Sequence, residues 1–293
     1  MTIRYLIARL ALAVLKRTAP HITPKDRRWL MQRTITSHFC VRATALVFLM
    51  QDAVLAWKNH NYDIAVNGEG ALLRRLVPFR PHIVLDVGAN VGDWSKAAAE
   101  KFPDAQLHAF EIVPETATAL QRNLQHLGGR LHINAYGLSD RDGCDTVYTV
   151  VSTTERASLN RAALTLDLNE QITPIAVKTI TGDVYLREHG IDHVDLLKID
   201  VEGAEMSVLR GFNASFRRGA IDMVQFEYGA INLTTRHFLA DFQVFFEQFG
   251  LQMGKVYPEG VLFKSYETMD EDFIGPVYVA CRRMDIIDAV RVR

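Results

Sequence analysis

A glycine-containing turn carries the first residues of this chain whose types and spacing could do chemistry. The apolar run 83–87 leads directly into Gly88-Ala89-Asn90-Val91-Gly92, and a helical segment starts at Asp93. Glycines at these two positions let the backbone turn tightly and pass close to a ligand, and a helix start offers free N–H donors. The segment predicts a nucleotide-type ligand, although many nucleotide-binding folds share such a turn.

Glu111 indicates more closely which ligand the turn binds, because it ends the next apolar run and lies 19 residues after Gly92. An acidic residue about 20 residues after such a turn typically accepts hydrogen bonds from ribose hydroxyls. A carboxylate there would repel a 2′-phosphate, so we expect an unphosphorylated adenosine. The alternative for Glu111 is an ordinary surface or helix-capping glutamate.

Asn90 and Asp86 distinguish a dinucleotide from S-adenosylmethionine. In a dinucleotide site the central glycine of G-x-G-x-x-G lets the backbone approach the pyrophosphate, but this chain has Asn90 at that place. The carboxylate of Asp86 suits the cationic, amino-bearing methionine end of S-adenosylmethionine. The residues therefore favour S-adenosylmethionine as the cofactor.

Alternating strand and helix patterns from residue 81 onward must position these residues, and they predict an α/β fold with a mostly parallel sheet. Helices are expected to start near Asp93, Glu115, Glu202 and Thr235. We expect residues 81–293 to form the cofactor-binding domain, with an insert at about 143–190 that shapes a pocket or lid. Residues 1–80 are expected to form a helical extension or cap. The predicted strands are 83–87, 106–111, 131–135, 194–199 and 221–226, with two more near 250–253 and 277–280.

The composition limits the partners and the compartment. The 293 residues include 33 Lys and Arg against 34 Asp and Glu, so no bulk field attracts nucleic acid, and a small neutral partner is easier to accommodate. The three cysteines lack a metal-binding or disulfide pattern, which favours a reducing cytoplasm.

The apolar segment 5–15 is too short to span a bilayer and is interrupted by Arg9. Residues 1–17 are more typical of an amphipathic helix, which would pack against the protein or a partner. Peripheral contact with a membrane surface and a cleaved signal are the two alternatives.

The chain from about 81 to 230 resembles the FkbM family of S-adenosylmethionine-dependent methyltransferases. The resemblance rests on six motifs in the family's order and spacing: LDVGANVGD at 85–93, AFE at 109–111, NAYGLSD at 134–140, ASL at 157–159, DLLKIDVEGAE at 195–205 and VQFEY at 224–228. It implies a class I methyltransferase (Rossmann-like) fold, whose seven-stranded, mostly parallel sheet ends in an antiparallel strand and has helices on both faces. It also implies O-methylation of a hydroxyl on a sugar, glycolipid or polyketide-like small molecule.

Positions in these motifs assign roles to individual residues. The resemblance places Glu111 at the ribose, and Ser139 and Asp140 near the adenine, where a turn-forming Ser-Asp pair is the alternative. One departure is Gly182, which replaces an apolar residue before Asp183 and puts the local packing in question. The residues expected at the methionine end are Asp86, Gly88, Asn90 and Gly92.

Methyl transfer requires the enzyme to position the acceptor oxygen and remove its proton. Asp200 ends the fourth predicted strand and is the leading candidate for the general base. Glu202 and Glu227 are the alternatives, although an acid such as Glu202 at a helix start often only stabilises the helix dipole. The three carboxylates could also hold a divalent cation, but no histidine supports a metal site and the family requires none.

Two other functions fit the same fold. A NAD-dependent oxidoreductase of the Rossmann type is disfavoured by Asn90 and by the lack of a Tyr-x-x-x-Lys pair. A non-catalytic binding module is disfavoured because Asp86, Glu111 and Asp200 are all present. Tyr228, Asn232 and His237 are further residues that could reach an acceptor.

Overall fold

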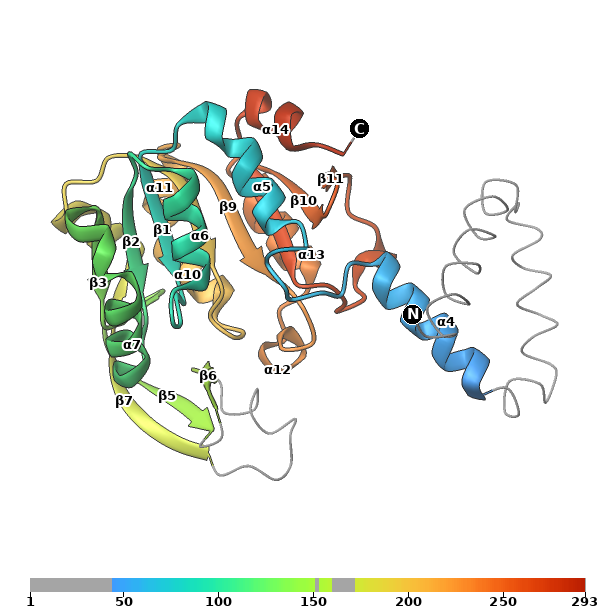
Figure 1. Cartoon of the computed structure of the whole chain (residues 1–293), viewed down its shortest axis with the longest axis horizontal. Coiled ribbons are helices and arrows are strands. Elements are labelled where there is room, and N and C mark those ends of the chain that lie inside the picture. Colours follow the sequence, from blue (N-terminus) through green and yellow to red (C-terminus); the bar gives the residue numbers. More distant parts are fainter. Residues whose placement is uncertain (1–43, 151–152, 160–171, 293) are drawn as a thin grey trace. The chain divides into compact units, whose positions relative to one another are not determined.

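A mostly parallel β-sheet forms the centre of the computed structural model, which describes residues 44–150, 153–159 and 172–292 (Figure 1). Its strand order is β11-β10-β12-β9-β8-β1-β2-β3. Strands β1, β2, β3, β8 and β9 pair in parallel, and β12 lies antiparallel between β9 and β10. The strands are β1 Ile83–Val87, β2 Gln106–Phe110, β3 Leu131–Asn134, β8 Val194–Ile199, β9 Ile221–Glu227, β10 Gln252–Tyr257, β11 Gly260–Phe263 and β12 Val277–Cys281.

The predicted fold class is confirmed, but the sheet has eight strands where seven were predicted. The additional strand is β11, which pairs antiparallel with β10 through the two-residue turn Pro258-Glu259. Gly260 opens β11 with φ 141°, a backbone conformation that glycine adopts readily. The prediction missed β11 because four residues are too short to show a period-two pattern.

Helices cover both faces of the sheet because alternate strand residues point to opposite sides. Leu85, Leu197 and Val224 belong to one buried cluster, whereas their neighbours Val84, Leu196 and Met223 belong to another. The first face packs against α9 Gly182–Glu188, α10 Glu205–Gly211, α11 Asn213–Arg217 and α13 Leu239–Glu247. The second packs against α5 Glu69–Leu76, α6 Asp93–Lys101 and α14 Met284–Val290. The remaining helices of this region are α7 Pro114–Leu124, α12 Asn232–Thr235 and the short 3-10 helices η2 Val77–Phe79, η3 Gln125–Arg130 and η4 Thr268–Asp270.

The insert forms a second sheet. Its two long strands, β5 and β7, pair antiparallel. The order of the sheet is β4-β7-β5-β6. Its strands are β4 Gly137–Ser139, β5 Gly143–Val150, β6 Thr153–Ser158 and β7 Ile172–Thr181.

The contacts divide the chain into two units, Met1–His60 and Asn61–Arg293. Helix α4, Thr44–Trp57, belongs to the first unit. Helix α5 lies within the predicted 1–80 extension but belongs to the second unit, because Leu72, Leu73 and Leu76 are buried in the cluster that also contains α6 and α14. The amphipathic segment expected at 1–17 lies outside the described residues. No helix within the described ranges is both long and apolar enough to cross a bilayer.

The glycine at position 182 has a packing reason. A β-carbon there would overlap the aromatic ring of Phe212, so this ring packs directly against the backbone of residue 182. Asp183 keeps a structural role, since its carboxylate accepts the backbone N–H groups of Ala214 and Ser215, each at 2.8 Å, at the start of α11.

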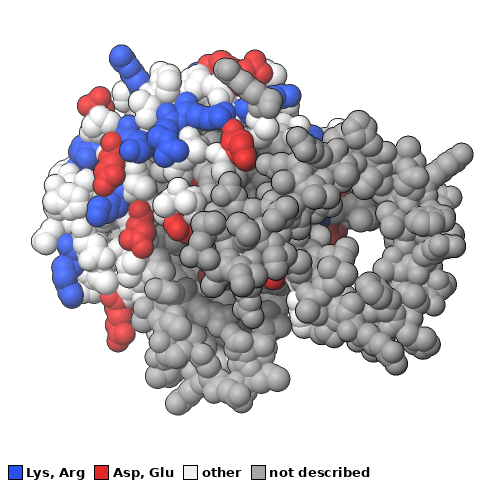
Figure 2. Space-filling view, turned by 45° about the vertical axis from the view of Figure 1, so that its right-hand side comes forward, with Lys and Arg blue, Asp and Glu red and all other residues white. Residues whose placement is uncertain are grey.

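Lys and Arg side chains gather in the upper part of the face shown in Figure 2, with Asp and Glu side chains between them. Charges of both signs alternate on the described part of this face.

Candidate active site

The turn between β1 and α6 passes against the end of β8. Gly88 has φ 82°, and a β-carbon on it would overlap the carbonyl oxygen of Asp200. Asn90 has φ 48°, a left-handed conformation in which Asn is tolerated better than most residues. The two chain segments can therefore touch only because residue 88 has no side chain.

Glu111 fixes the shape of this turn. One carboxylate oxygen accepts the N–H of Asn90 at 2.9 Å, and the other accepts the N–H of Val113 at 2.8 Å. Burial raises the pKa of Glu111, and the two N–H groups partly offset this rise. A carboxylate has about four lone-pair sites, so each oxygen retains one for a ligand hydroxyl.

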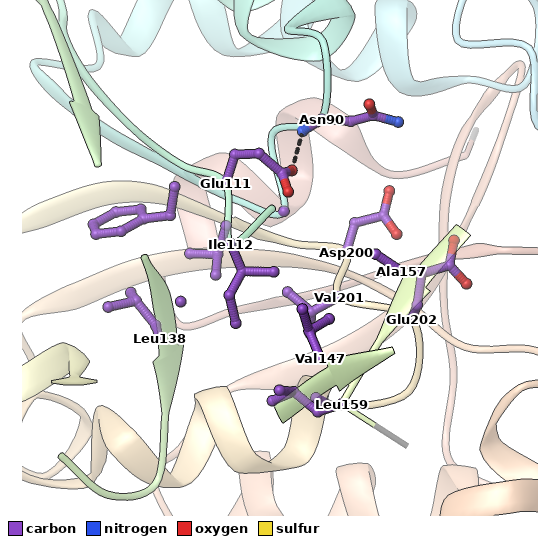
Figure 3. Close-up of a pocket in the computed structure, with 15 residues that line it drawn as sticks. Asn90, Glu111, Ile112, Leu138, Val147, Ala157, Leu159, Asp200, Val201 and Glu202 are labelled. Carbon is purple, nitrogen blue, oxygen red and sulfur yellow. Dashed lines mark hydrogen bonds between the residues drawn. The ribbon is translucent and has the colours of Figure 1, made fainter. Parts of the chain in front are cut away.

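A hollow of about 700 Å³ lies beside Glu111, and Gly88, Asn90, Asp200 and Glu202 also line it. Figure 3 shows Glu111 reaching the N–H of Asn90, with the carboxylates of Asp200 and Glu202 in the same pocket. The sequence analysis did not predict that the hollow has an apolar wall, although Ala157 and Leu159 belong to the ASL motif at 157–159. That wall includes Phe110, Ile112, Leu138, Val147, Ala157 and Leu159. Three residues of this wall, Val147, Ala157 and Leu159, lie in the insert.

Asp86 lies beneath the turn and does not line this hollow. It is buried, accepts a hydrogen bond of 2.7 Å from Ser95 Oγ, and pairs with Lys198 Nζ at 3.2 Å. The same ammonium group contacts Asp200 Oδ2 at 3.3 Å and the carbonyl oxygen of Gly88 at 3.2 Å. Lys198 thus connects the turn between β1 and α6 to the end of β8.

Burial and the neighbouring carboxylates have opposite effects on the pKa of Lys198. Burial alone would lower its pKa, but the carboxylates of Asp200, Asp86 and Glu69 together raise it above the ordinary value. Lys198 is therefore a permanent buried cation within this group of acids.

Asp200 and Glu227 form a hydrogen-bonded carboxyl pair at the ends of adjacent strands. Burial alone would raise the pKa of Asp200, but Lys198 and the hydrogen bond from Glu227 bring it below the usual value. Burial and the charge of Asp200 hold the pKa of Glu227 well above its usual range. The opposite directions of the two shifts favour a state of the pair in which Asp200 is ionised and Glu227 keeps a proton.

The loop after Asp200 is held in shape by Glu205. Its Oε1 accepts the N–H groups of Val201 at 3.2 Å and Gly203 at 3.0 Å. Glu202 has φ 52°, and its carbonyl oxygen accepts a hydrogen bond of 2.6 Å from Ser158 Oγ of β6. Glu202 lines the hollow, whereas the fully buried Glu205 supports the loop from behind.

Replacement of Glu205 by glutamine is expected to remove part of the pH dependence of stability. Burial is the main cause that raises the pKa of Glu205 from 4.5 to about 7, although two loop N–H groups lower it in part. The unfolded chain therefore ionises first, and the free energy of unfolding falls as the pH rises from about 4.5 to about 7. The loss is at most about 3 kcal/mol. Glutamine keeps the accepting oxygen without the charge.

Urea unfolding at a series of pH values measures this effect. Glu205→Gln should lose less stability between pH 5 and pH 8 than the unsubstituted protein, and Glu188→Gln, at an exposed glutamate of α9, should not differ from it. Equal slopes for all three proteins would show that Glu205 ionises normally in the fold.

Besides Asp86, three more of the predicted cofactor residues lie outside the hollow. A β-carbon on Gly92 would press against the side chains of Leu120 and Leu124, so this glycine serves packing against α7. Ser139 is buried and lies 3.4 Å from Asp140 Oδ1, while Asp140 is exposed. The residues of β4 that line the hollow are Gly137 and Leu138.

Of the further acceptor candidates, Tyr228 and Asn232 make structural hydrogen bonds. The Tyr228 hydroxyl donates to Glu271 at 2.6 Å, and Asn232 Oδ1 accepts the N–H of Gly229 at 2.9 Å. None of Tyr228, Asn232 and His237 lines the hollow.

One group of potential metal ligands among the described residues consists of His193, Asp195 and Asp222. It lies at the amino ends of β8 and β9, away from the hollow. Asp222 already pairs with Arg283 at 3.2 Å, and Asp195 accepts the N–H groups of His82 and Ile83, each at 2.9 Å. Asp195 and Asp222 therefore already have partners in the protein, and their contacts hold the ends of neighbouring strands together.

The fold and the site together define an α/β protein with a hollow at the carboxyl ends of its parallel strands, the edge where open α/β sheets bind ligands. The model of the methyltransferase FkbM domain matches residues 86–252, which is more than half of the chain. The chain therefore belongs to the FkbM methyltransferase family, as the sequence motifs predicted.

Three curated relatives illustrate the similarity. "Methyltransferase 1" of Beauveria bassiana is 29% identical over 44% of this chain and 58% of its own length. The 31-O-demethyl-FK506 methyltransferase FkbM of Streptomyces tacrolimicus is 32% identical over 47% of this chain and 63% of its own. The hexuronic acid methyltransferase AglP of Haloferax volcanii is 24% identical over 64% of this chain and 73% of its own. The chain spans less than two thirds of the length of the first two relatives.

Proposed function

We propose that this protein is an S-adenosylmethionine-dependent O-methyltransferase that acts on a hydroxyl group of a sugar, glycolipid or polyketide-like small molecule. The observation that carries the proposal is one hollow lined both by Glu111, with lone pairs to accept hydroxyl groups, and by Asp200, an ionised carboxylate. A ribose-binding acid and a base are thus within one site.

The residues present fit the cofactor. Glu111 would accept the ribose hydroxyls, and the apolar side chains of Ile112, Leu138 and Leu159 would surround the adenine. Gly88 and Asn90 would lie along the methionine end. S-adenosylmethionine supplies a methyl group activated by a sulfonium, so the protein has only to position the acceptor and remove its proton.

Asp200 is the proposed general base. Its carboxylate would accept the proton of the acceptor hydroxyl as the oxygen bonds to the methyl group. Glu227, which holds the shared proton, would orient Asp200 by donating to it, and Lys198 would keep Asp200 ionised until the acceptor arrives. Asp86 acts indirectly in this proposal, since it holds Lys198 in place.

The relatives support an oxygen acceptor. The name of one relative specifies methylation at the 31-O position of FK506, and another acts on a hexuronic acid. Both names describe small oxygenated molecules, the broad acceptor class proposed here, although the hexuronic acid of the second relative carries a carboxylate.

Calorimetric titration tests the cofactor assignment directly. S-adenosylhomocysteine should bind to the protein, and NADH should not compete with it. Binding of NADH in place of S-adenosylhomocysteine would overturn the methyltransferase proposal in favour of an oxidoreductase.

A further inference from the structure

A second hollow, of about 350 Å³, lies on the α5 side of the carboxyl pair. It shares Asp200 with the first hollow and is also lined by Glu227. Since the proposed base lines both hollows, a molecule in the second hollow would lie next to the reacting hydroxyl.

The side chain of Gln225 is the observation that indicates a ligand in this second hollow. This side chain is only 2% exposed, and its Oε1 has no hydrogen-bond partner among the residues that the structure describes. Its Nε2 donates to Glu69 Oε1. The other Glu69 oxygen accepts from Asn67 Nδ2 at 2.7 Å, so both oxygens of Glu69 act as acceptors and the Gln225 amide nitrogen must face Glu69. The amide oxygen is left available, and a buried acceptor without a partner is unfavourable.

The register of the sheet explains how Gln225 comes to lie there. Asp86 is opposite Lys198 on β8, and Lys198 is opposite Gln225 on β9, so all three side chains are on the face covered by α5 and α6. Lys198 is satisfied by Asp86 and Asp200. Gln225 therefore ends this polar row with its oxygen unused.

The wall of the second hollow comes partly from outside the family match. Tyr62, Asn67 and Glu69 precede residue 86, where the match begins. Tyr62 is exposed at the rim, and partial burial together with the carboxylates of Glu227, Glu202 and Asp200 raises its pKa to about 12. The segment before the matched domain thus contributes an aromatic ring and hydrogen-bonding groups beside the base.

We propose that the second hollow is an acceptor subsite that binds a hydroxyl neighbouring the one that is methylated, with Gln225 Oε1 as its hydrogen-bond acceptor. This inference rests on the proposed function. An acceptor with adjacent hydroxyls satisfies both the base and Gln225. A carboxylate on the acceptor would lie beside the ionised Asp200 and be repelled by it, so we expect an uncharged acceptor to bind more tightly than an acidic one.

Ligand binding to the protein saturated with S-adenosylhomocysteine tests the subsite, with NMR titration as the measurement. The probes are cis-1,2-cyclohexanediol and cyclohexanol, which differ by one hydroxyl, and methyl glucoside and methyl glucuronide, which differ by one carboxylate. We expect the diol to bind at least about tenfold more tightly than cyclohexanol, and the glucoside at least about tenfold more tightly than the glucuronide.

The variant Gln225→Met keeps the length of the side chain but has no amide. It should bind S-adenosylhomocysteine within about twofold of the unsubstituted protein, while the diol-to-alcohol ratio falls close to one. Gln248→Met, at an exposed position after α13, is the matched control and should keep the ratio. A ratio of affinities is insensitive to a general loss of stability.

The outcomes separate the two proposals. Loss of S-adenosylhomocysteine binding by the unsubstituted protein would overturn the proposed function itself. If that ligand binds but no probe does, or if diol and alcohol bind equally, the subsite is wrong. A diol preference that persists in Gln225→Met would assign the second hydroxyl to another residue and overturn the role of Gln225. Equal binding of glucoside and glucuronide would overturn the charge selection.

Discussion

Replacement of Glu111 by alanine is expected to weaken the binding of S-adenosylhomocysteine by at least about a hundredfold. The carboxylate would accept two ribose hydroxyls, and hydrogen bonds to charged groups contribute about 1.5–3 kcal/mol each. The substitution also removes the acceptor that holds the N–H of Asn90 at 2.9 Å, so the turn loses its support. Calorimetric titration measures the affinity, and circular dichroism checks that the variant is folded.

The control for this experiment is Glu115→Ala, which removes the same charge from an exposed position in the first turn of α7. Its affinity for S-adenosylhomocysteine should remain within about twofold of the unsubstituted protein. If Glu111→Ala is folded and binds the ligand normally, Glu111 does not hold a ribose and its role is only to support the turn.

The variant Asp200→Asn is expected to lose about 10²- to 10⁴-fold in turnover, the usual contribution of general acid–base catalysis. Asparagine has nearly the same shape but cannot accept the proton of the acceptor hydroxyl at neutral pH. Cofactor affinity should change little, because Glu111 and the turn remain intact. The measurement is transfer of a radiolabelled methyl group to the best-binding neutral glycoside, together with calorimetry of S-adenosylhomocysteine.

Glu227→Gln provides the comparison that identifies the base. Because Glu227 is the protonated partner, glutamine can still donate a hydrogen bond to Asp200, and turnover should stay within about tenfold of the unsubstituted enzyme. If instead Glu227→Gln abolishes turnover and Asp200→Asn preserves it, the base is Glu227.

The sequence alone was sufficient to predict the structural elements that depend on a local residue pattern. The five parallel strands, the glycine turn and the spacing from Gly92 to Glu111 are determined by periodicity and by short-range backbone constraints. The structure places Glu111 against the N–H of Asn90, within the hollow that the turn was expected to form. The prediction of Asp200 at the carboxyl end of β8, beside β1, follows equally from strand order.

The tertiary structure decided which side chains meet across strands. The sequence prediction put Asp86 at the methionine end, but its side chain is turned beneath the turn toward Lys198 and Ser95. The expectation for Ser139 also depended on its place after the third core strand, whereas β4 belongs to the second sheet and presents Gly137 and Leu138 to the hollow.

The proton shared by Asp200 and Glu227 and the unpaired oxygen of Gln225 depend on contacts between residues 25 or more positions apart in the chain, and on the burial that those contacts create. Strand periodicity predicts which face a side chain occupies but not its cross-strand neighbour. The sequence therefore determined the family and the cofactor prediction. The charge state of the base, and the groups that surround the acceptor, were decided only by the register of the folded sheet and the packing of α5 against it.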